Sequence, residues 1–408
     1  MDVSDDHLVI VGAGSLGLFI ASQALKSYSK VEIHEAKSQV GGITRDFYSN
    51  SGVQFLSGCQ YLSENTLPDS FDLANSLSAF EHRYSSLTEQ GKNWNFKPNF
   101  SGPAFEFDFT KPQPLLFAED SIADRLNLYP SNIRLTLKKF IQRIVPFSLD
   151  ELHPTGLESL SLDRITSLDA EDDLLILKHS DHLADSIYGV SRELLGIGYE
   201  KAYIPNNGFD EFYTSLLESL RSFEALKIYD NQRISTKNWS SVAYPERSYT
   251  KIWCADPRFF VQHFKQKKLQ SLSYPVYNYG LVVTGYSGFS LPYYINVFSG
   301  INPILRIYFY ETKSQVKVTV ESASLFDSEL SLLSCLHRLL RNTPFKAKFS
   351  SKPVAMQKTR RYFPISNSDY NDIIDVENTM SDCGWTNTFP HLFSRAVRLH
   401  LILDELGL

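Results

Sequence analysis

A glycine-rich turn close to the amino terminus constrains the fold of this chain more than any other feature. Residues 8–11 form a short apolar run rich in β-branched side chains, which is typical of a strand buried on both faces of a parallel sheet. The turn at 12–17 follows, then small and apolar residues at helical spacing over 18–25, and then an alternating segment at 31–35. This order predicts a strand, a tight turn, a helix and a second parallel strand, and therefore an α/β fold.

Each glycine of the turn has its own physical role in holding a dinucleotide. Gly12 makes the sharp turn, Gly14 lets the backbone approach a pyrophosphate, and Gly17 lets the helix pack closely on the strand. The phosphates then lie against the first helical residues, Ser15 and Leu16, where unpaired N–H groups and the helix dipole compensate their charge. The alternative is a glycine turn without a ligand. The strand, helix and second strand in register favour the dinucleotide.

An acidic residue ends the second strand of this unit. Glu35 is placed to accept hydrogen bonds from the two ribose hydroxyls of a dinucleotide, and its charge disfavours a 2′-phosphate. We expect the next residue, Ala36, to contact the cofactor as well. These features alone leave open whether the dinucleotide is NAD or FAD.

Composition and charge exclude several other classes of protein. The 408 residues are 43% hydrophobic and 21% charged, which is typical of a globular chain that can bury a large core. A net charge of −6 without long basic runs gives no sign of nucleic-acid binding. The four cysteines are far apart without a CxxC pair, so we expect no metal site and no disulfide framework. With no apolar run long enough to span a membrane, we expect a cytoplasmic protein.

The segment after Glu35 carries a resemblance to a known family. It contains Gly41-Gly42 followed closely by Arg45, and this pattern resembles the extended fingerprint of the flavin-containing amine oxidase and protoporphyrinogen oxidase superfamily, which includes UDP-galactopyranose mutase-like proteins. The resemblance implies FAD rather than NAD. It also implies that the paired glycines run along the FAD pyrophosphate. Arg45 offers a planar cation for phosphate oxygens or the flavin edge, and the alternative is a turn with a solvated arginine.

Three later segments are similar to elements of the same superfamily. The segment at 52–62 resembles the strand and turn whose second glycine, here Gly58, lies close to the flavin ring, with Gln60 as a candidate flavin-facing side chain. UDP-galactopyranose mutases carry Gly-Pro-His where this chain has Gly-Cys-Gln. The segments at 226–229 and 232–236 look like the strand pair that meets the adenine, so the resemblance places Ile234 against it.

The carboxyl-terminal region departs from the pattern. The oxidase branch closes with a Gly-Asp motif that holds the FAD ribityl and phosphate, and this motif is absent here. A helix is still expected after it, and the resemblance implies that His391 and Leu392 at its start face flavin O2; His391 is alternatively a polar turn residue. Arg360 and Arg361 are candidates for an anionic substrate or the FAD phosphates, although strand alternation lets only one of them point inward.

A helix is also predicted over 133–145 in the middle of the chain. Its apolar stripe comprises Ile133, Leu135, Leu137, Phe140, Ile141 and Ile144. The basic residues Arg134, Lys138, Lys139 and Arg143 lie elsewhere on the helix, and we interpret them as a solvated face. A second helical pattern covers 182–196.

Together these patterns predict an α/β fold in which a Rossmann-like FAD-binding domain of the glutathione-reductase type is interleaved with a substrate domain of mixed sheet and helices. The FAD-binding domain comprises 1–64, 200–258 and 352–408, and the substrate domain comprises 65–199 and 259–351. The leading hypothesis is a FAD-dependent oxidoreductase that transfers hydride from a small polar substrate to flavin N5. A mutase-like sugar isomerase and a non-catalytic FAD-fold binding protein are the alternatives. The sequence leaves the substrate, the catalytic residues, the electron acceptor and the oligomeric state open.

Overall fold

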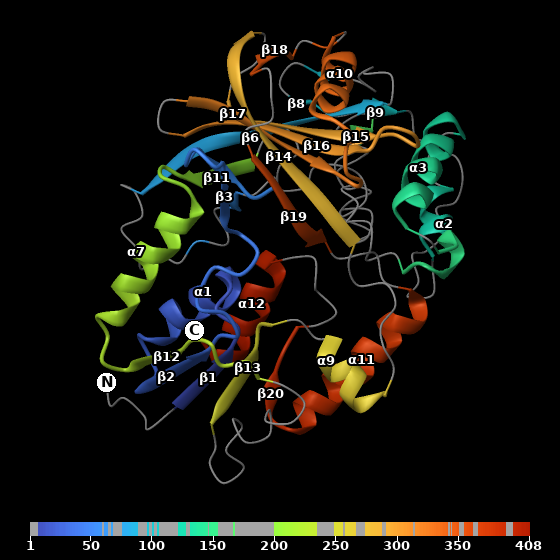
Figure 1. Cartoon of the computed structure of the whole chain (residues 1–408). Helices are drawn as coiled ribbons and strands as arrows, with labels where there is room; N and C mark the ends of the chain where they lie inside the picture. Colours follow the sequence, from blue (N-terminus) through green and yellow to red (C-terminus); the bar gives the residue numbers. More distant parts are fainter. Residues whose placement is uncertain are drawn as a thin grey trace.

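The computed structural model arranges two sheets one above the other (Figure 1). It describes residues 7–58, 61–63, 67, 76–88, 96–97, 100–101, 104–105, 121–127, 131–145, 147–153, 166–167, 200–234, 249–255, 258–266, 274–287, 291–312, 315–341, 343, 345–350, 355–361, 366–388 and 395–408. Among these residues, no helix combines the length and the hydrophobicity that a membrane crossing requires.

The lower sheet is parallel and has five strands in the order β12-β2-β1-β13-β20. Its strands are β1 (His7–Val11), β2 (Lys30–His34), β12 (Leu226–Tyr229), β13 (Thr250–Trp253) and β20 (Trp385–Thr386). Every residue of β1 is buried, as expected for a central strand covered on both faces. The predicted unit of strand, turn, helix and parallel strand is confirmed by β1, helix α1 (Ser15–Ala24) and β2. Residues 232–234, predicted as part of a strand, are not in one.

The upper sheet is mixed and has nine strands in the path β18-β14-β17-β16-β15-β6-β11-β5, with β19 beside β14. Its strands are β5 (Leu62–Ser63), β6 (Leu77–Thr88), β11 (Glu200–Pro205), β14 (Tyr274–Ser287), β15 (Tyr293–Phe298), β16 (Ile304–Thr312), β17 (Gln315–Ser322), β18 (Lys346–Phe349) and β19 (Ala355–Arg361). Among the described strands of this sheet, β6 and β15 alone pair in parallel, and the other pairs are antiparallel. The strands predicted around 303–321 are therefore confirmed.

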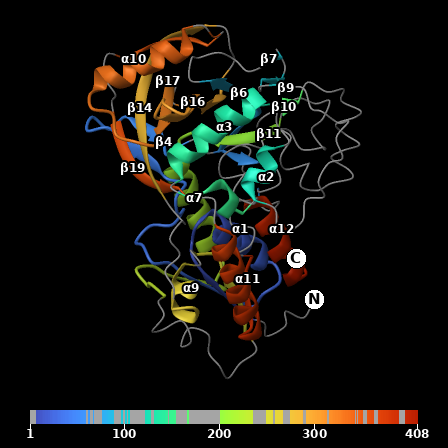
Figure 2. The same cartoon turned by 90° about the vertical axis from the view of Figure 1, so that its right-hand side faces the viewer.

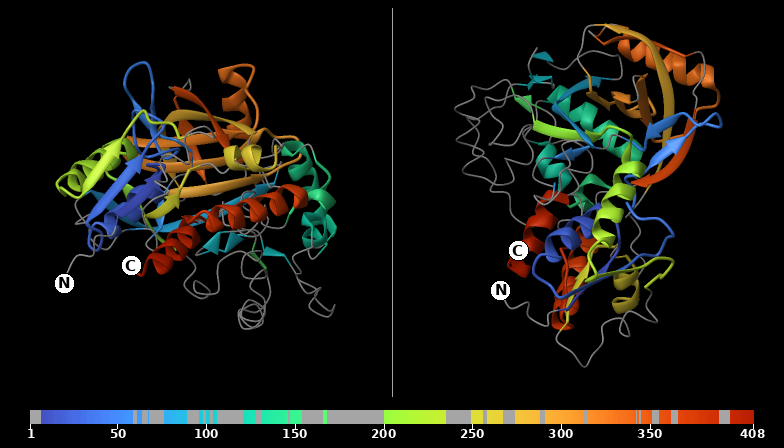
Figure 3. Two further views of the ribbon diagram at one scale, coloured as in Figure 1. Left: turned by 90° about the horizontal axis from the view of Figure 1, so that it is seen from below. Right: turned by 90° about the vertical axis from the view of Figure 1, so that its left-hand side faces the viewer.

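Helices cover both sheets. Besides α1 they are α2 (Ile122–Leu126), α3 (Ser131–Ile144), α7 (Phe209–Arg221), α9 (Arg258–Phe264), α10 (Glu329–Leu340), α11 (Asn367–Asp382), α12 (Arg395–Leu406) and the 3-10 turn η3 (Leu149–Glu151). Helix α10 lies beside the mixed sheet (Figure 2), and its apolar side chains belong to the same buried cluster as those of β14, β16 and β17. Helix α7 contacts β11 of the mixed sheet and β12 of the parallel sheet, so it connects the two (Figure 3).

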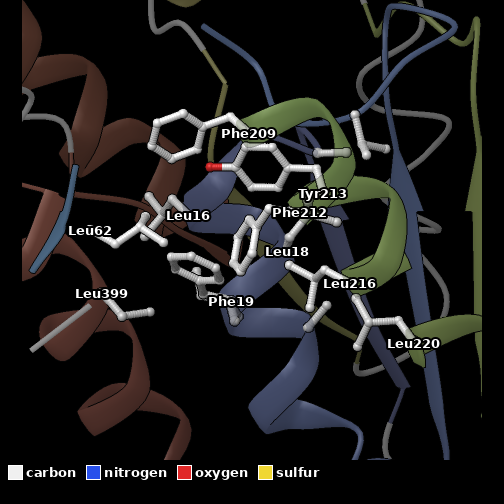
Figure 4. Close-up of a cluster of buried hydrophobic side chains, with 14 of the residues drawn as sticks. Leu16, Leu18, Phe19, Leu62, Phe209, Phe212, Tyr213, Leu216, Leu220 and Leu399 are labelled. Carbon is white, nitrogen blue, oxygen red and sulfur yellow. The ribbon is translucent and has the colours of Figure 1, made fainter. Parts of the chain in front are cut away.

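Within the described part of the chain, a large apolar cluster joins α1, α7 and α12. Figure 4 shows Leu16, Leu18 and Phe19 of α1 facing the side chains of α7, with Leu62 and Leu399 closing the other side. Helix α1 is buried on nearly all faces because it lies between these elements. This cluster fixes the position of the glycine turn at the start of α1.

Three short strand pairs complete the description: β3 (Asp46–Tyr48) with β4 (Gln54–Leu56), β7 (Phe96–Lys97) with β8 (Phe100–Ser101), and β9 (Ala104–Phe105) with β10 (Thr166–Ser167). All strands of the parallel sheet come from the segments that the sequence assigns to the FAD-binding domain. Strands β5, β11 and β19 come from those segments too, yet they pair in the mixed sheet. The helix predicted at 182–196 lies outside the described residues.

Candidate functional site

The glycine turn brings backbone atoms closer together than any other residue allows. Gly12 has a φ of +104°, and its N–H donates to the carbonyl of His34 at 2.8 Å. A Cβ atom on Gly17 would lie 2.0 Å from the Gly12 carbonyl oxygen. The turn and the first coil of α1 therefore cross at a distance that only glycine permits at position 17.

The paired glycines return the chain to this same turn. Gly41 donates its N–H to the carbonyl of Ala13 at 2.8 Å and forms a parallel bridge with Gly14. A Cβ on Gly42 would lie 3.1 Å from the Gly14 Cα, and both paired glycines have positive φ. By contrast, a Cβ on Gly14 would meet only the Gly42 Cα at 3.9 Å. The two glycine segments thus form one backbone-walled cradle.

Glu35 is buried beside this cradle. Its carboxylate accepts hydrogen bonds from the backbone N–H groups of Ala13 at 2.7 Å and Lys37 at 2.9 Å. Ala36, the residue after Glu35, is exposed. The side chain of His34 stacks on Tyr229, and burial lowers its pKa. Its buried Nε2 atom has no hydrogen-bond partner among the described residues. An acid and a neutral imidazole therefore mark the end of β2.

The first turn of α1 starts at this cradle without a side-chain cap. Gly14 is its N-cap, Ser15 and Leu16 are buried, and its first turn has no acidic residue. The N–H groups at a helix start need acceptors from outside the helix. This end of α1 is therefore suited to an anionic group.

Arg45 lies between the paired glycines and α7. Its Nε donates to Asp210 at 2.8 Å and its Nη1 donates to the carbonyl of Val40 at 3.1 Å. These bonds hold the glycine segment against the start of α7, where Gly208 also has a positive φ. Contact between Arg45 and a cofactor stays a prediction.

Gly58 lies against a buried charged cluster that sequence reasoning missed. A Cβ on Gly58 would lie 2.6 Å from Glu321 Oε1. Glu321 forms a 2.5 Å ion pair with Arg306 across β16 and β17, and Arg306 also donates to the Tyr294 hydroxyl at 2.8 Å. All three are almost fully buried. Arg306 lies among apolar residues of β16, but that strand also carries Glu311, and β17 carries Lys317 besides Glu321, so the sequence does not single out this pair.

Two amides extend this cluster along β14 and β19. Asn278 donates from Nδ2 to the Thr359 hydroxyl at 2.9 Å, and its buried Oδ1, close to Gly58, has no hydrogen-bond partner among the described residues. Ser57 donates to Gln357 Oε1 at 2.8 Å. The mixed sheet therefore presents a row of polar groups to the segment that precedes residue 59.

The remaining predicted residues divide into three groups. Arg360 is exposed on β19, and the backbone of Arg361 pairs with Tyr274. Ile234 is buried in a cluster with Val11 and Trp253 at the carboxyl edge of the parallel sheet. Gln60, His391 and Leu392 lie outside the described residues.

Asn387, which sequence reasoning also missed, lies at the same edge. Thr386 of β20 pairs with Ile252 of β13, which pairs with Ile10 of β1, and Asn387 follows directly at the carboxyl end. Asn387 is 7% exposed, and neither atom of its amide has a hydrogen-bond partner among the described residues. A buried amide without partners is costly, and a polar ligand at this position would recover that cost.

Comparison with known proteins identifies the fold. No protein-family model matches the chain, and no curated protein matches it. Among solved structures, a reduced UDP-galactopyranose mutase is 12% identical with a TM-score of 0.62, over 98% of this chain and 96% of that one. A redesigned putrescine oxidase is 14% identical (TM-score 0.52, 98% of both chains), and a fatty acid isomerase from P. acnes is 12% identical (TM-score 0.51, 99% of both). The chain therefore has the fold of UDP-galactopyranose mutase and putrescine oxidase, which confirms its resemblance to the amine oxidase-like superfamily at the level of the fold.

Proposed function

We propose that this chain is a FAD-dependent oxidoreductase of the amine oxidase-like superfamily. Its FAD-binding domain, of the glutathione-reductase type, comprises 1–64, 200–258 and 352–408, and its substrate domain comprises 65–199 and 259–351. Bound FAD supplies a hydride acceptor at flavin N5 for a small polar substrate. The observation that carries this proposal is the cradle of Gly14 and Gly42 beside the buried carboxylate of Glu35.

The cradle fits the pyrophosphate and ribose of FAD. Gly14 has space for close approach of a ligand, since a Cβ there would meet only one atom within 4 Å. The uncapped N–H groups of Ser15 and Leu16 would hold the phosphate oxygens at the positive end of α1. Glu35 would bond the ribose hydroxyls in place of one of its backbone donors.

The flavin end of the cofactor would lie towards Gly58. There the buried Oδ1 of Asn278 offers an acceptor. At the carboxyl edge of the parallel sheet, the amide of Asn387 offers a donor and an acceptor for the ribityl chain or a phosphate, the role that Gly-Asp fills in the oxidase branch. The ion pair of Arg306 and Glu321 would fix the sheet against the ring and exclude water from it.

Flavin absorbance and two glycine substitutions test this proposal. The purified protein should show flavin bands, and Gly14→Ala should weaken FAD binding by at least about tenfold, or about 1.4 kcal/mol. Its unfolding should match the wild type because the added Cβ lies 3.9 Å from its nearest neighbour. The control is Gly285→Ala on β14, where a Cβ meets nothing within 4 Å and where FAD binding should not change.

Three results would contradict the proposal in different ways. If the purified protein took up no FAD, only the alternative of a non-catalytic binding protein would remain. Turnover of a nucleotide sugar that requires prior reduction with dithionite, without consumption of an oxidant, would replace the oxidoreductase with a mutase-like isomerase. Unchanged FAD affinity in Gly14→Ala would remove the cradle from the cofactor site.

A further inference from the structure

Arg143 on α3 has a buried guanidinium with unused hydrogen-bond donors. Its Nε and Nη2 atoms are buried and have no hydrogen-bond partner among the described residues. The guanidinium carbon lies 5.9 Å from the centre of the Phe140 ring, which packs edge-on against Phe298 of β15. Burial lowers the pKa of Arg143 to about 10. The interpretation of this residue as part of a solvated face is therefore wrong.

Tyr274 at the start of β14 connects Arg143 with the charged cluster at Gly58. Its hydroxyl is buried, and the charges of Arg306, Glu321 and Arg143 all act on it. Burial raises the pKa of Tyr274 well above its usual range, so the phenol stays neutral. Helix α3, which carries Arg143, contacts β15, and β15 supplies Tyr294 to the charged cluster.

The two unused atoms define the shape of the missing partner. Nε–H and the neighbouring Nη2–H point in parallel from one edge of the guanidinium, and this edge matches two oxygens of a planar oxyanion. Buried donors of a charged group are costly to leave without acceptors. A ligand that supplies both oxygens recovers that cost.

The charges favour a monoanion. The described side chains around Tyr274 carry two positive charges, on Arg143 and Arg306, and one negative charge, on Glu321. Because Arg306 and Glu321 already pair, the charge of Arg143 is the one that these three side chains leave uncompensated. A carboxylate neutralises it, whereas a phosphate monoester with about −1.5 to −2 charges at pH 7 would leave an excess of buried negative charge.

We propose that Arg143 binds the carboxylate of the substrate through its Nε and Nη2 donors. The inference rests on the proposed function, because it assigns a substrate class, small carboxylic acids, to the same flavoenzyme site. It distinguishes this chain from an enzyme that selects amines, which would need an anionic or aromatic site for a cation rather than an arginine.

Thermal shift measurements with four small aromatic probes test the proposal. The full-length protein, with and without added FAD, is titrated with benzoate, the neutral isostere benzamide, benzylamine and phenyl phosphate. Arg143→Met removes the donors, Arg143→Lys keeps the charge without the paired edge, and Lys138→Met removes an exposed cation of the same helix as a matched control. FAD uptake of every sample is read from its absorbance.

We expect benzoate alone to raise the melting temperature of the wild type and of Lys138→Met. Its Kd should rise at least about tenfold in Arg143→Met and by less in Arg143→Lys. Equal benzoate binding in all variants, no binding at all, or a stronger effect of benzylamine or phenyl phosphate would overturn the proposal. If FAD binds but the binding of benzoate does not depend on Arg143, the inference fails while the proposed function stands. If benzoate binding depends on Arg143 but the protein takes up no FAD, the proposed function fails and an arginine-dependent carboxylate site remains.

Discussion

Replacement of Gly17 by alanine tests the closest backbone contact of the glycine turn. The new Cβ would lie 2.0 Å from the carbonyl oxygen of Gly12, 3.2 Å from its carbonyl carbon and 3.3 Å from the side chain of Ile10. Favourable contacts between heavy atoms lie at about 3.5–4.0 Å, so the overlap with the oxygen exceeds about 1 Å. Rotation of a side chain cannot relieve it, because the oxygen belongs to the turn and the Cβ is fixed on α1.

We expect Gly17→Ala to cost about 3 kcal/mol, the upper end of the usual range for added atoms in a packed core. For a cooperative unit of about 150–250 residues, this corresponds to a melting temperature lower by about 6–12 °C. Differential scanning calorimetry and urea denaturation measure the loss. Gly285→Ala is the control, because its Cβ meets nothing within 4 Å and its φ lies outside the left-handed region. If the two variants melted at the same temperature, α1 would not cross the turn as described.

Two further predictions concern buried polar groups. Burial raises the pKa of Asp46, which accepts from Gln54 at 2.6 Å and from the N–H of Asp210 at 3.0 Å. Because the pKa of Asp46 is raised in the folded state, its contribution to stability is greatest below the ordinary pKa of about 3.9 and is lost as the pH rises through the folded pKa. Asn at this position does not titrate. The free energy of unfolding of Asp46→Asn, measured by urea titration, should therefore rise relative to that of the wild type over this pH range. A constant difference at every pH would contradict this. Asn387→Ala should leave the melting temperature of the FAD-free protein unchanged or higher, since its amide has no partner among the described residues, but should weaken FAD binding in a fluorescence titration. Equal FAD affinity in the variant and the wild type would remove Asn387 from the cofactor site.

The amino-terminal unit could be predicted from the sequence because its signals are local. The apolar strand, the three glycines and the acidic end of β2 lie within thirty-five residues, and each has one physical reason. The return of Gly41 and Gly42 to Gly14 could be expected only through the family resemblance, since spacing alone does not say which way the chain turns after β2.

The charged cluster could not be predicted in this way. Arg306 and Glu321 become neighbours through the register of β16 and β17, and that register shifts between 304 and 306. Periodicity also misplaced two residues of α3: Leu135 was assigned to the apolar stripe but is 54% exposed, while Arg143 was assigned to the solvated face but has buried donors. Sequence periodicity identifies the more apolar face of a helix, but the packing of neighbouring elements determines which faces are buried.

The order of strands in the parallel sheet has a consequence for how the chain acquires its shape during synthesis. β1 lies between β2 and β13, whose pairing residues are 31 and 250, and β20 joins only at 385. A ribosome must therefore release β13, about 220 residues after β2, before β1 has both neighbours, and it must release residues 385–387 before the edge carries Asn387. Closing such long loops is slow, and the apolar strand β1 stays exposed meanwhile. FAD can therefore stabilise the fold through both the cradle and Asn387 only after β20 has paired with β13.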